Sequence, residues 1–165
     1  MSNKKQKSID LLNRAIGDEL SAINQYMYFH FHCDDQGYDL LGTLFKKTAI
    51  EEMRHVETIA DRILFLKGEI AMEPSQKVHY TSDIREMLTF AVGEEESAMT
   101  MYNDFANQSA QNLDSVTKRL FEDIIIDEER HFDQFDTEID NLEKFGDRYL
   151  ALQSIERSKT RSTMP

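Results

Sequence analysis

Two Glu-x-x-His pairs constrain this chain most: Glu52 with His55, and Glu128 with His131. Each pair lies inside a long helical pattern, so the carboxylate and the imidazole leave the same helix face about one turn apart. A single such pair is common on exposed helices and carries little information. Two pairs on separate helices can hold two metal ions side by side if two further helices supply carboxylates. The repeat therefore predicts a helical bundle built around a pair of metal ions.

Apolar residues recur at intervals of three and four along most of the chain, which is typical of amphipathic helices. The 165 residues include only 6 Gly and 2 Pro, so breaks between helices are few. We predict an all-α fold with four long helices and a short fifth one, over about 5–34, 39–67, 82–106, 113–144 and 147–157. Gly68 is expected to end the second helix and Ser82 to cap the third.

The stretch over 69–81 contains a Pro and lacks helical periodicity. We expect it to be a long crossover that runs along the bundle and joins two parallel helices. The chain is then one domain over 1–158, followed by a polar tail over 159–165 that we predict to be disordered.

Glu19 and Glu94 lie close to the apolar stripes of the first and third helices. Charged residues rarely lie there unless they are paired or bind a ligand. With these two, the first helix pair carries a Glu and then a Glu-x-x-His, and the second pair repeats the order. The predicted metal ligands are Glu19, Glu52, His55, Glu94, Glu128 and His131. Four carboxylates balance the charge of two divalent ions, and oxygen ligands with one nitrogen per ion favour iron or manganese.

The net charge of -12 and a pI near 4.8 argue against nucleic acid as a partner, because phosphate binding depends on Lys and Arg. Cys33 is the only cysteine, which excludes an intramolecular disulfide and suits a reducing compartment. The N-terminal lysines precede no apolar segment of the kind found in secretory signals, and no run approaches 18 apolar residues. We therefore predict a cytoplasmic protein with no membrane contact.

Three segments resemble bacterioferritins: "LLNRAIGDELSAINQYMYF", "IEEMRHVETIADRILFLKG" and "DEERHFDQFDTEIDNLEKFG". The resemblance spans roughly residues 8–157 and implies a ferritin-like four-helix bundle with a long crossover between helices two and three and a short fifth C-terminal helix. It also implies an iron-storage ferroxidase with two iron ions per subunit. Such a protein oxidises Fe(II) to Fe(III) with O₂ or H₂O₂ and stores the product as a mineral inside a hollow homo-oligomeric shell. A reductant such as a ferredoxin would serve iron release.

The same resemblance assigns roles to individual residues. Glu19 and His55 would be terminal ligands of one iron, and Glu94 and His131 of the other. Glu52 and Glu128 would bridge the two ions. Tyr26 would hydrogen-bond or donate an electron near the site, and otherwise is a buried tyrosine with a satisfied hydroxyl. Met53 would ligate haem b shared between two subunits, and otherwise packs at an interface. Lys47 and Glu51 replace the His and Asp of an accessory iron site, which leaves that site in doubt.

Two alternatives compete with this interpretation. A dodecameric mini-ferritin that protects against peroxide and iron stress has a related fold, but the ligands expected here lie within one bundle. A rubrerythrin would add a cysteine-rich domain, for which this chain has no room. The apolar residues of the fifth helix, including Tyr149, Leu150, Leu152 and Ile155, need a neighbour to cover them, so we predict a shell of 24 copies.

Overall fold

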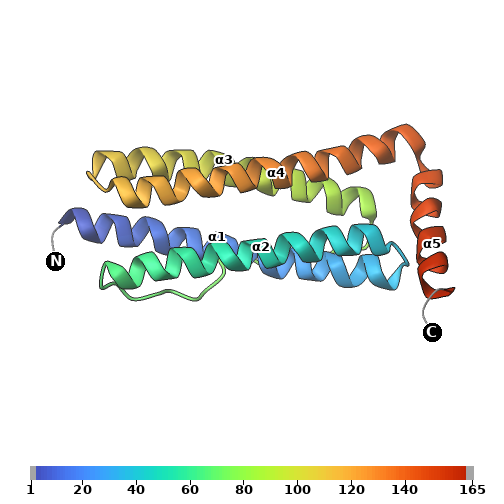
Figure 1. The fold of residues 1–165 in the computed structure, drawn as a ribbon, viewed down its shortest axis with the longest axis horizontal. Helices are drawn as coiled ribbons and strands as arrows, with labels where there is room; N and C mark the ends of the chain where they lie inside the picture. The colour runs from blue at the N-terminus through green and yellow to red at the C-terminus, as the bar shows by residue number, and fades with distance from the viewer. Residues whose placement is uncertain (1–2, 163–165) are drawn as a thin grey trace.

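The computed structural model describes residues 3–162, with side chains from 4 to 155. It contains five helices and no strand within that range. The helices are α1 (Asn3–Asp35), α2 (Asp39–Phe65), α3 (Ile84–Gln111), α4 (Ser115–Phe145) and α5 (Asp147–Ser162). Figure 1 shows α1 to α4 as an elongated bundle, with α5 lying across one end. The predicted all-α fold with four long helices and a shorter fifth is confirmed.

The bundle consists of two helical hairpins, because α1 packs mainly on α2 and α3 mainly on α4. The crossover after α2 runs along α1 for most of the length of the crossover. Its Ser75 backbone N–H donates to the Gly17 carbonyl at 2.9 Å, and further along His79 exchanges two hydrogen bonds with the side chain of Gln25. These contacts satisfy the backbone of a segment without secondary structure. They confirm the predicted crossover, which places the start of α3 at the end of the bundle where α2 also starts (Figure 1).

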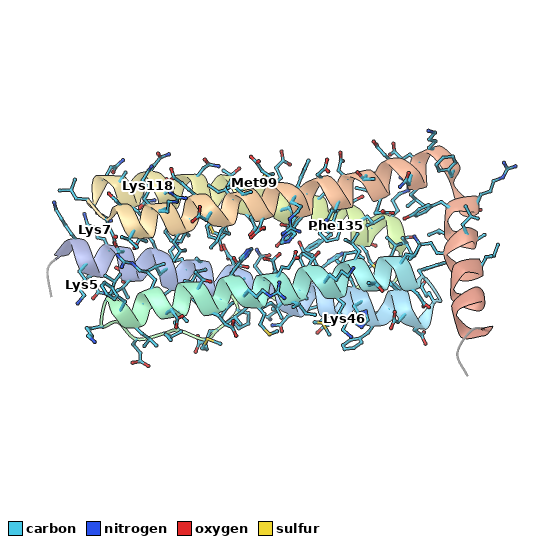
Figure 2. All side chains as sticks on the ribbon, in the orientation of Figure 1. Lys5, Lys7, Lys46, Met99, Lys118 and Phe135 are labelled. Atoms are coloured by element: carbon cyan, nitrogen blue, oxygen red, sulfur yellow. The ribbon has the colours of Figure 1, made fainter. Side chains whose placement is uncertain are left out.

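Buried apolar side chains form two clusters, one in each half of the bundle. One cluster contains Leu12, Ile59 and Phe121, and the other contains Phe45 and Phe135. Figure 2 shows Phe135 between the two helix pairs. Along all four helices, the predicted metal ligands occupy sequence positions between these clusters. The layer of acidic residues is therefore closed by packed apolar side chains on both sides.

Three helix ends in α2 and α3 differ from the prediction. Asp83, not Ser82, caps α3 and accepts a hydrogen bond from the Glu86 N–H at 2.8 Å. Lys67, not Gly68, adopts the left-handed conformation after α2, with φ of 60°. The α3 helix also continues to Gln111, through much of the segment predicted to be a break, and the buried Ser109 continues its buried face there.

The α5 helix packs across the end of the bundle through a short polar network. The Gln153 side chain is buried, accepts the Leu41 backbone N–H at 3.2 Å and donates to the Tyr149 hydroxyl at 2.8 Å. Tyr149 in turn donates to Glu138 on α4. The helix reaches Ser162, beyond the predicted end at residue 157. The tail expected to be disordered over 159–165 thus falls partly on this helix and partly on residues 163–165, which lie outside the described range. No helix between residues 3 and 162 combines the length and the apolar character that a membrane crossing requires.

Candidate metal centre

Six buried side chains from all four long helices meet between the two apolar clusters. They form two groups of four that share two members, and within each group the ligand atoms lie within 4.8 Å of one another. The first group is Glu19, Glu52, His55 and Glu128, and the second is Glu52, Glu95, Glu128 and His131. Each group offers three carboxylates and one imidazole, which is the donor set expected for iron or manganese.

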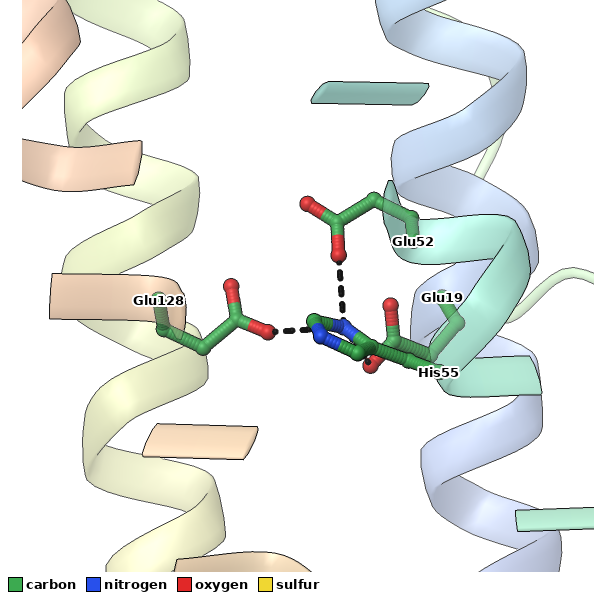
Figure 3. Close-up of side chains that lie close together, drawn as sticks. All are labelled: Glu19, Glu52, His55 and Glu128. Atoms are coloured by element: carbon green, nitrogen blue, oxygen red, sulfur yellow. Dashed lines mark ion pairs between the residues drawn. The ribbon is translucent and has the colours of Figure 1, made fainter. Parts of the chain in front are cut away.

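His55 lies at the centre of the first group. Its Nδ1 atom is 2.8 Å from Glu52 Oε2 and 3.3 Å from both Glu19 Oε1 and Glu128 Oε1. Figure 3 shows these three carboxylates turned toward the imidazole. In the second group, His131 Nδ1 is 3.1 Å from Glu52 Oε1, 3.6 Å from Glu128 Oε2 and 3.7 Å from Glu95 Oε2.

Glu52 and Glu128 each direct one oxygen toward His55 and the other toward His131. A carboxylate that faces both groups can bridge two metal ions. The Nδ1 atoms of both histidines, both oxygens of Glu52 and Glu128 Oε1 are buried and form no hydrogen bond within the described part of the chain. Buried polar atoms are rarely left unsatisfied, so their presence in one cluster fits a site that binds a cation.

Burial and mutual charge shift the pKa values of the clustered side chains. Burial raises the pKa of Glu19 and of Glu95 well above the usual range, and the nearby charges of Glu52 and Glu128 add to the increase. Burial alone would lower the pKa of His55 and His131, but the carboxylates around them outweigh it and raise it. A divalent ion bound among these groups would favour their deprotonated forms, so metal binding would release any protons they hold.

Two tyrosines hydrogen-bond to the outer carboxylates. Tyr26 on α1 donates to Glu95 on α3, and Tyr102 on α3 donates to Glu19 on α1. Both rings are buried, and burial raises the pKa of both hydroxyls well above the usual value. Each tyrosine therefore stays protonated and orients one carboxylate, which places Tyr26 beside the cluster as predicted.

The remaining nitrogens of the two imidazoles contact carboxylates outside the cluster. His55 Nε2 lies 3.2 Å from Asp127 Oδ2 on α4, and His131 Nε2 lies 2.7 Å from Glu51 Oε2 on α2. A carboxylate can only accept, so it holds the proton on Nε2 and leaves Nδ1 free to bind a metal. Glu51 thus contacts a predicted ligand. The sequence alone identifies it only as the residue that replaces the Asp of an accessory iron site.

Comparisons with known proteins agree with this geometry. A family model described as a ferritin-like domain matches residues 9–145. A bacterioferritin from Desulfovibrio desulfuricans is 36% identical over 149 residues, covering 90% of this chain and 83% of that protein. A bacterioferritin from Rhodobacter capsulatus is 34% identical, covering 88% of this chain and 91% of that protein.

The chain belongs to the bacterioferritin family. Its fold is also similar to the X-ray structure of the Desulfovibrio desulfuricans bacterioferritin, whose description refers to a diiron site in different catalytic states. The TM-score is 0.91 at 35% sequence identity, and the match covers 92% of this chain and 89% of that one. Within this member of the family, the structure brings together five of the six predicted ligands: Glu19, Glu52, His55, Glu128 and His131.

Glu94 is the predicted ligand that does not join the cluster. Glu95 lies there instead and is 2% exposed. Glu94 is half-buried and lines a pocket of about 200 Å³ that Glu95 and three other clustered carboxylates also line. Both residues fit an apolar stripe, because each lies a helical step of three or four after Ala91. Tertiary packing decides between them, since the buried face of α3 passes through Ala91, Glu95 and Tyr102.

An internal repeat in the sequence could have identified Glu95. The step from Glu19 to Glu52 equals the step from Glu95 to Glu128, whereas Glu94 is one residue out of register. The step from Glu19 to Tyr26 likewise equals the step from Glu95 to Tyr102, the tyrosine that sequence reasoning missed.

Met53 lies apart from the cluster, as predicted from its position between Glu52 and His55. Its side chain is 50% exposed, whereas its two neighbours in the cluster are buried. Nearby Ile50 is also exposed, so this face of α2 carries apolar side chains that the single chain does not cover.

Proposed function

We propose that this chain is the subunit of an iron-storage ferroxidase that binds two Fe(II) ions at the cluster and oxidises them to Fe(III). The observation that carries the proposal is the pair of carboxylates, Glu52 and Glu128, that each face both histidines from within a buried layer. Their unpaired oxygens and the two free Nδ1 atoms, together with the carboxylates of Glu19 and Glu95, form a donor set for two adjacent divalent ions.

In the proposed reaction each Fe(II) loses one electron, and the oxidant takes the pair. With two protons, O₂ becomes H₂O₂, and H₂O₂ becomes two waters. Glu52 and Glu128 would hold both ions, while Glu19 and Glu95 would supply the outer carboxylates. The hydroxyls of Tyr26 and Tyr102 keep those outer carboxylates oriented toward the site. The Fe(III) product then passes to a mineral held inside an oligomeric shell, from which a reductant such as a ferredoxin would release it.

A stopped-flow comparison of two variants tests this proposal. Glu128→Ala removes a carboxylate that faces both groups, so Fe(II) oxidation should slow at least tenfold while the native mass stays unchanged. The matched control is Glu129→Ala, because Glu129 is the adjacent residue on α4 and is exposed. Oxidation by Glu128→Ala at the wild-type rate would remove the site assignment.

Haem b shared between two subunits is a separate part of the proposal. Met53 suits such a ligand because it carries a thioether, is half-exposed and lies outside the cluster near the exposed Ile50. When bound, haem would supply a redox-active iron at the boundary between two subunits. A Soret band in protein produced with ample haem would support this role, and its absence would count against it.

A closed shell of 24 copies is likewise proposed. Leu152 and Ile155 on α5 are 58% and 50% exposed. Leu40 at the start of α2 is 59% exposed and lines the same pocket as Leu152. Such a face favours packing against symmetry mates around a fourfold axis. The dodecameric mini-ferritin alternative is less favoured because both metal groups lie within one chain. Native mass separates the two assemblies, and a cytoplasmic location stays a prediction from the sequence.

A further inference from the structure

Arg130 on α4 joins the two carboxylates that contact the histidines from outside the cluster. Its Nη1 donates to Glu51 Oε2 at 3.0 Å, and its Nη2 donates to Asp127 Oδ1 at 2.7 Å. A planar guanidinium presents its N–H groups in a fixed fork, so one arginine can set the positions of two carboxylates together.

Each of these carboxylates then reaches the histidine on the opposite helix. Glu51 on α2 contacts Nε2 of His131 on α4, and Asp127 on α4 contacts Nε2 of His55 on α2. The same Oε2 atom of Glu51 contacts both Arg130 and His131. Arg130 is therefore one contact away from each imidazole, although it touches neither.

We propose that Arg130 is a positioning residue that, through Glu51 and Asp127, holds both imidazoles with Nδ1 turned into the metal site. This inference rests on the proposed function, because it concerns the ligands of the same two ions. Without the fork, each carboxylate could turn toward solvent, and each imidazole could then rotate or exchange its proton between nitrogens. Metal binding would then have to fix the orientation and the tautomer of both imidazoles, so the affinity for the metal would fall.

The expected effect is on metal binding and not on folding. The side chains of Arg130, Glu51 and Asp127 are 42%, 30% and 43% exposed. Ion pairs as exposed as these contribute little to stability. A variant at Arg130 should therefore fold and assemble normally, which separates a positioning role from a merely structural one.

The chain offers a matched control for this residue. Arg54 precedes His55 as Arg130 precedes His131, at the equivalent position of the internal repeat. Arg54 is exposed, and its side chain forms no ion pair within the described residues. Arg54→Gln removes the same charge beside the other histidine but keeps the hydrogen bonds from Arg130 to Glu51 and Asp127.

The test is a Co(II) titration of the metal-free shell, followed by the visible absorption of the bound ion. Arg130→Gln should lower the Co(II) affinity about tenfold, in the range known for residues that support metal ligands. It should also change the Co(II) spectrum, while native mass and melting temperature match the wild type. Arg54→Gln should behave as the wild type.

A double-mutant cycle shows whether Arg130 acts through the two carboxylates. In a Glu51→Gln, Asp127→Asn background, Arg130→Gln should cause no further loss of affinity. Full additivity, or wild-type Co(II) binding by Arg130→Gln, would overturn the inference. The proposed function fails separately: wild-type protein that binds no Co(II), or Glu128→Ala that binds it as tightly as the wild type, would contradict the metal site itself.

Discussion

Exchanging Glu95 for glutamine distinguishes the metal ligand from its neighbour Glu94. Glu95→Gln keeps the shape and leaves an oxygen that can still accept from Tyr26, but it removes one of four buried negative charges. Two effects of opposite sign should follow. The metal-free protein should become more stable at neutral pH, and the metal-bound protein should lose affinity.

The first effect follows from the raised pKa of Glu95, which burial and then Glu128 and Glu52 produce. A carboxyl whose folded pKa is raised contributes stability that is fully present below the unfolded pKa of about 4.3 and is lost as the pH rises through the folded value. Glutamine does not titrate, so the variant avoids this loss. Its advantage over the wild type should grow as the pH rises above about 4 and should disappear below that pH.

The second effect, the loss of metal affinity, can be estimated from the Coulomb energy of the removed charge. A unit charge about 4 Å from another contributes roughly 4 kcal/mol at an effective dielectric constant of about 20. Part of that is offset because the variant also relieves repulsion from Glu52 and Glu128. A net loss of about 3 kcal/mol corresponds to roughly a hundredfold weaker binding. At a metal concentration of about 100 Kd for the wild type, binding stabilises the fold by about 2.7 kcal/mol, most of which the variant should lack.

Thermal unfolding of the metal-free and Co(II)-loaded proteins at pH 7, together with a Co(II) titration, measures both effects. Glu94→Gln is the control, because Glu94 lines the same pocket without joining either group of ligands. Its Co(II) affinity should stay within about threefold of the wild type, well inside the hundredfold loss expected at Glu95. A hundredfold loss at Glu94 with none at Glu95 would refute the assignment.

Three further predictions concern other parts of the chain. Met53→Leu should assemble and oxidise Fe(II) normally but bind no haem, and a Soret band equal to that of the wild type would contradict this. Truncation after Gly146, which removes α5, should give smaller or unstable assemblies with poor iron retention, whereas full-sized shells by native mass would show that α5 is dispensable. Asp114→Ala removes the cap of α4 and the partner of Arg62 at 2.6 Å, and should lower stability by about 1–2 kcal/mol in denaturant unfolding. Burial opposes the lowered pKa of Asp114, but Thr117 and Arg62 outweigh it, so its contribution is present above about pH 4 and is lost as the pH falls through the folded pKa. A stability difference that persists unchanged at low pH would argue against this role.

The sequence by itself determined the bundle and five of the six clustered side chains. Helical periodicity and the scarcity of Gly and Pro predict four long helices, and the Glu-x-x-His repeat places a carboxylate and an imidazole on one face of each of two helices. These are local properties, since positions three and four apart share a helix face wherever the helix packs. Glu19 could be predicted for the same reason, because it is a charged residue within an apolar stripe.

Only the tertiary structure decided the questions that depend on how helices rotate against one another. Glu94 and Glu95 both fit the stripe of α3, and the packing of that helix against α4 brings Glu95 into the layer that contains His131. The contacts of Tyr102 with Glu19, and of Arg130 with Glu51, likewise connect residues on different helices. Periodicity along one helix cannot predict such contacts, because they depend on the relative rotation and height of two helices, which the whole core determines at once.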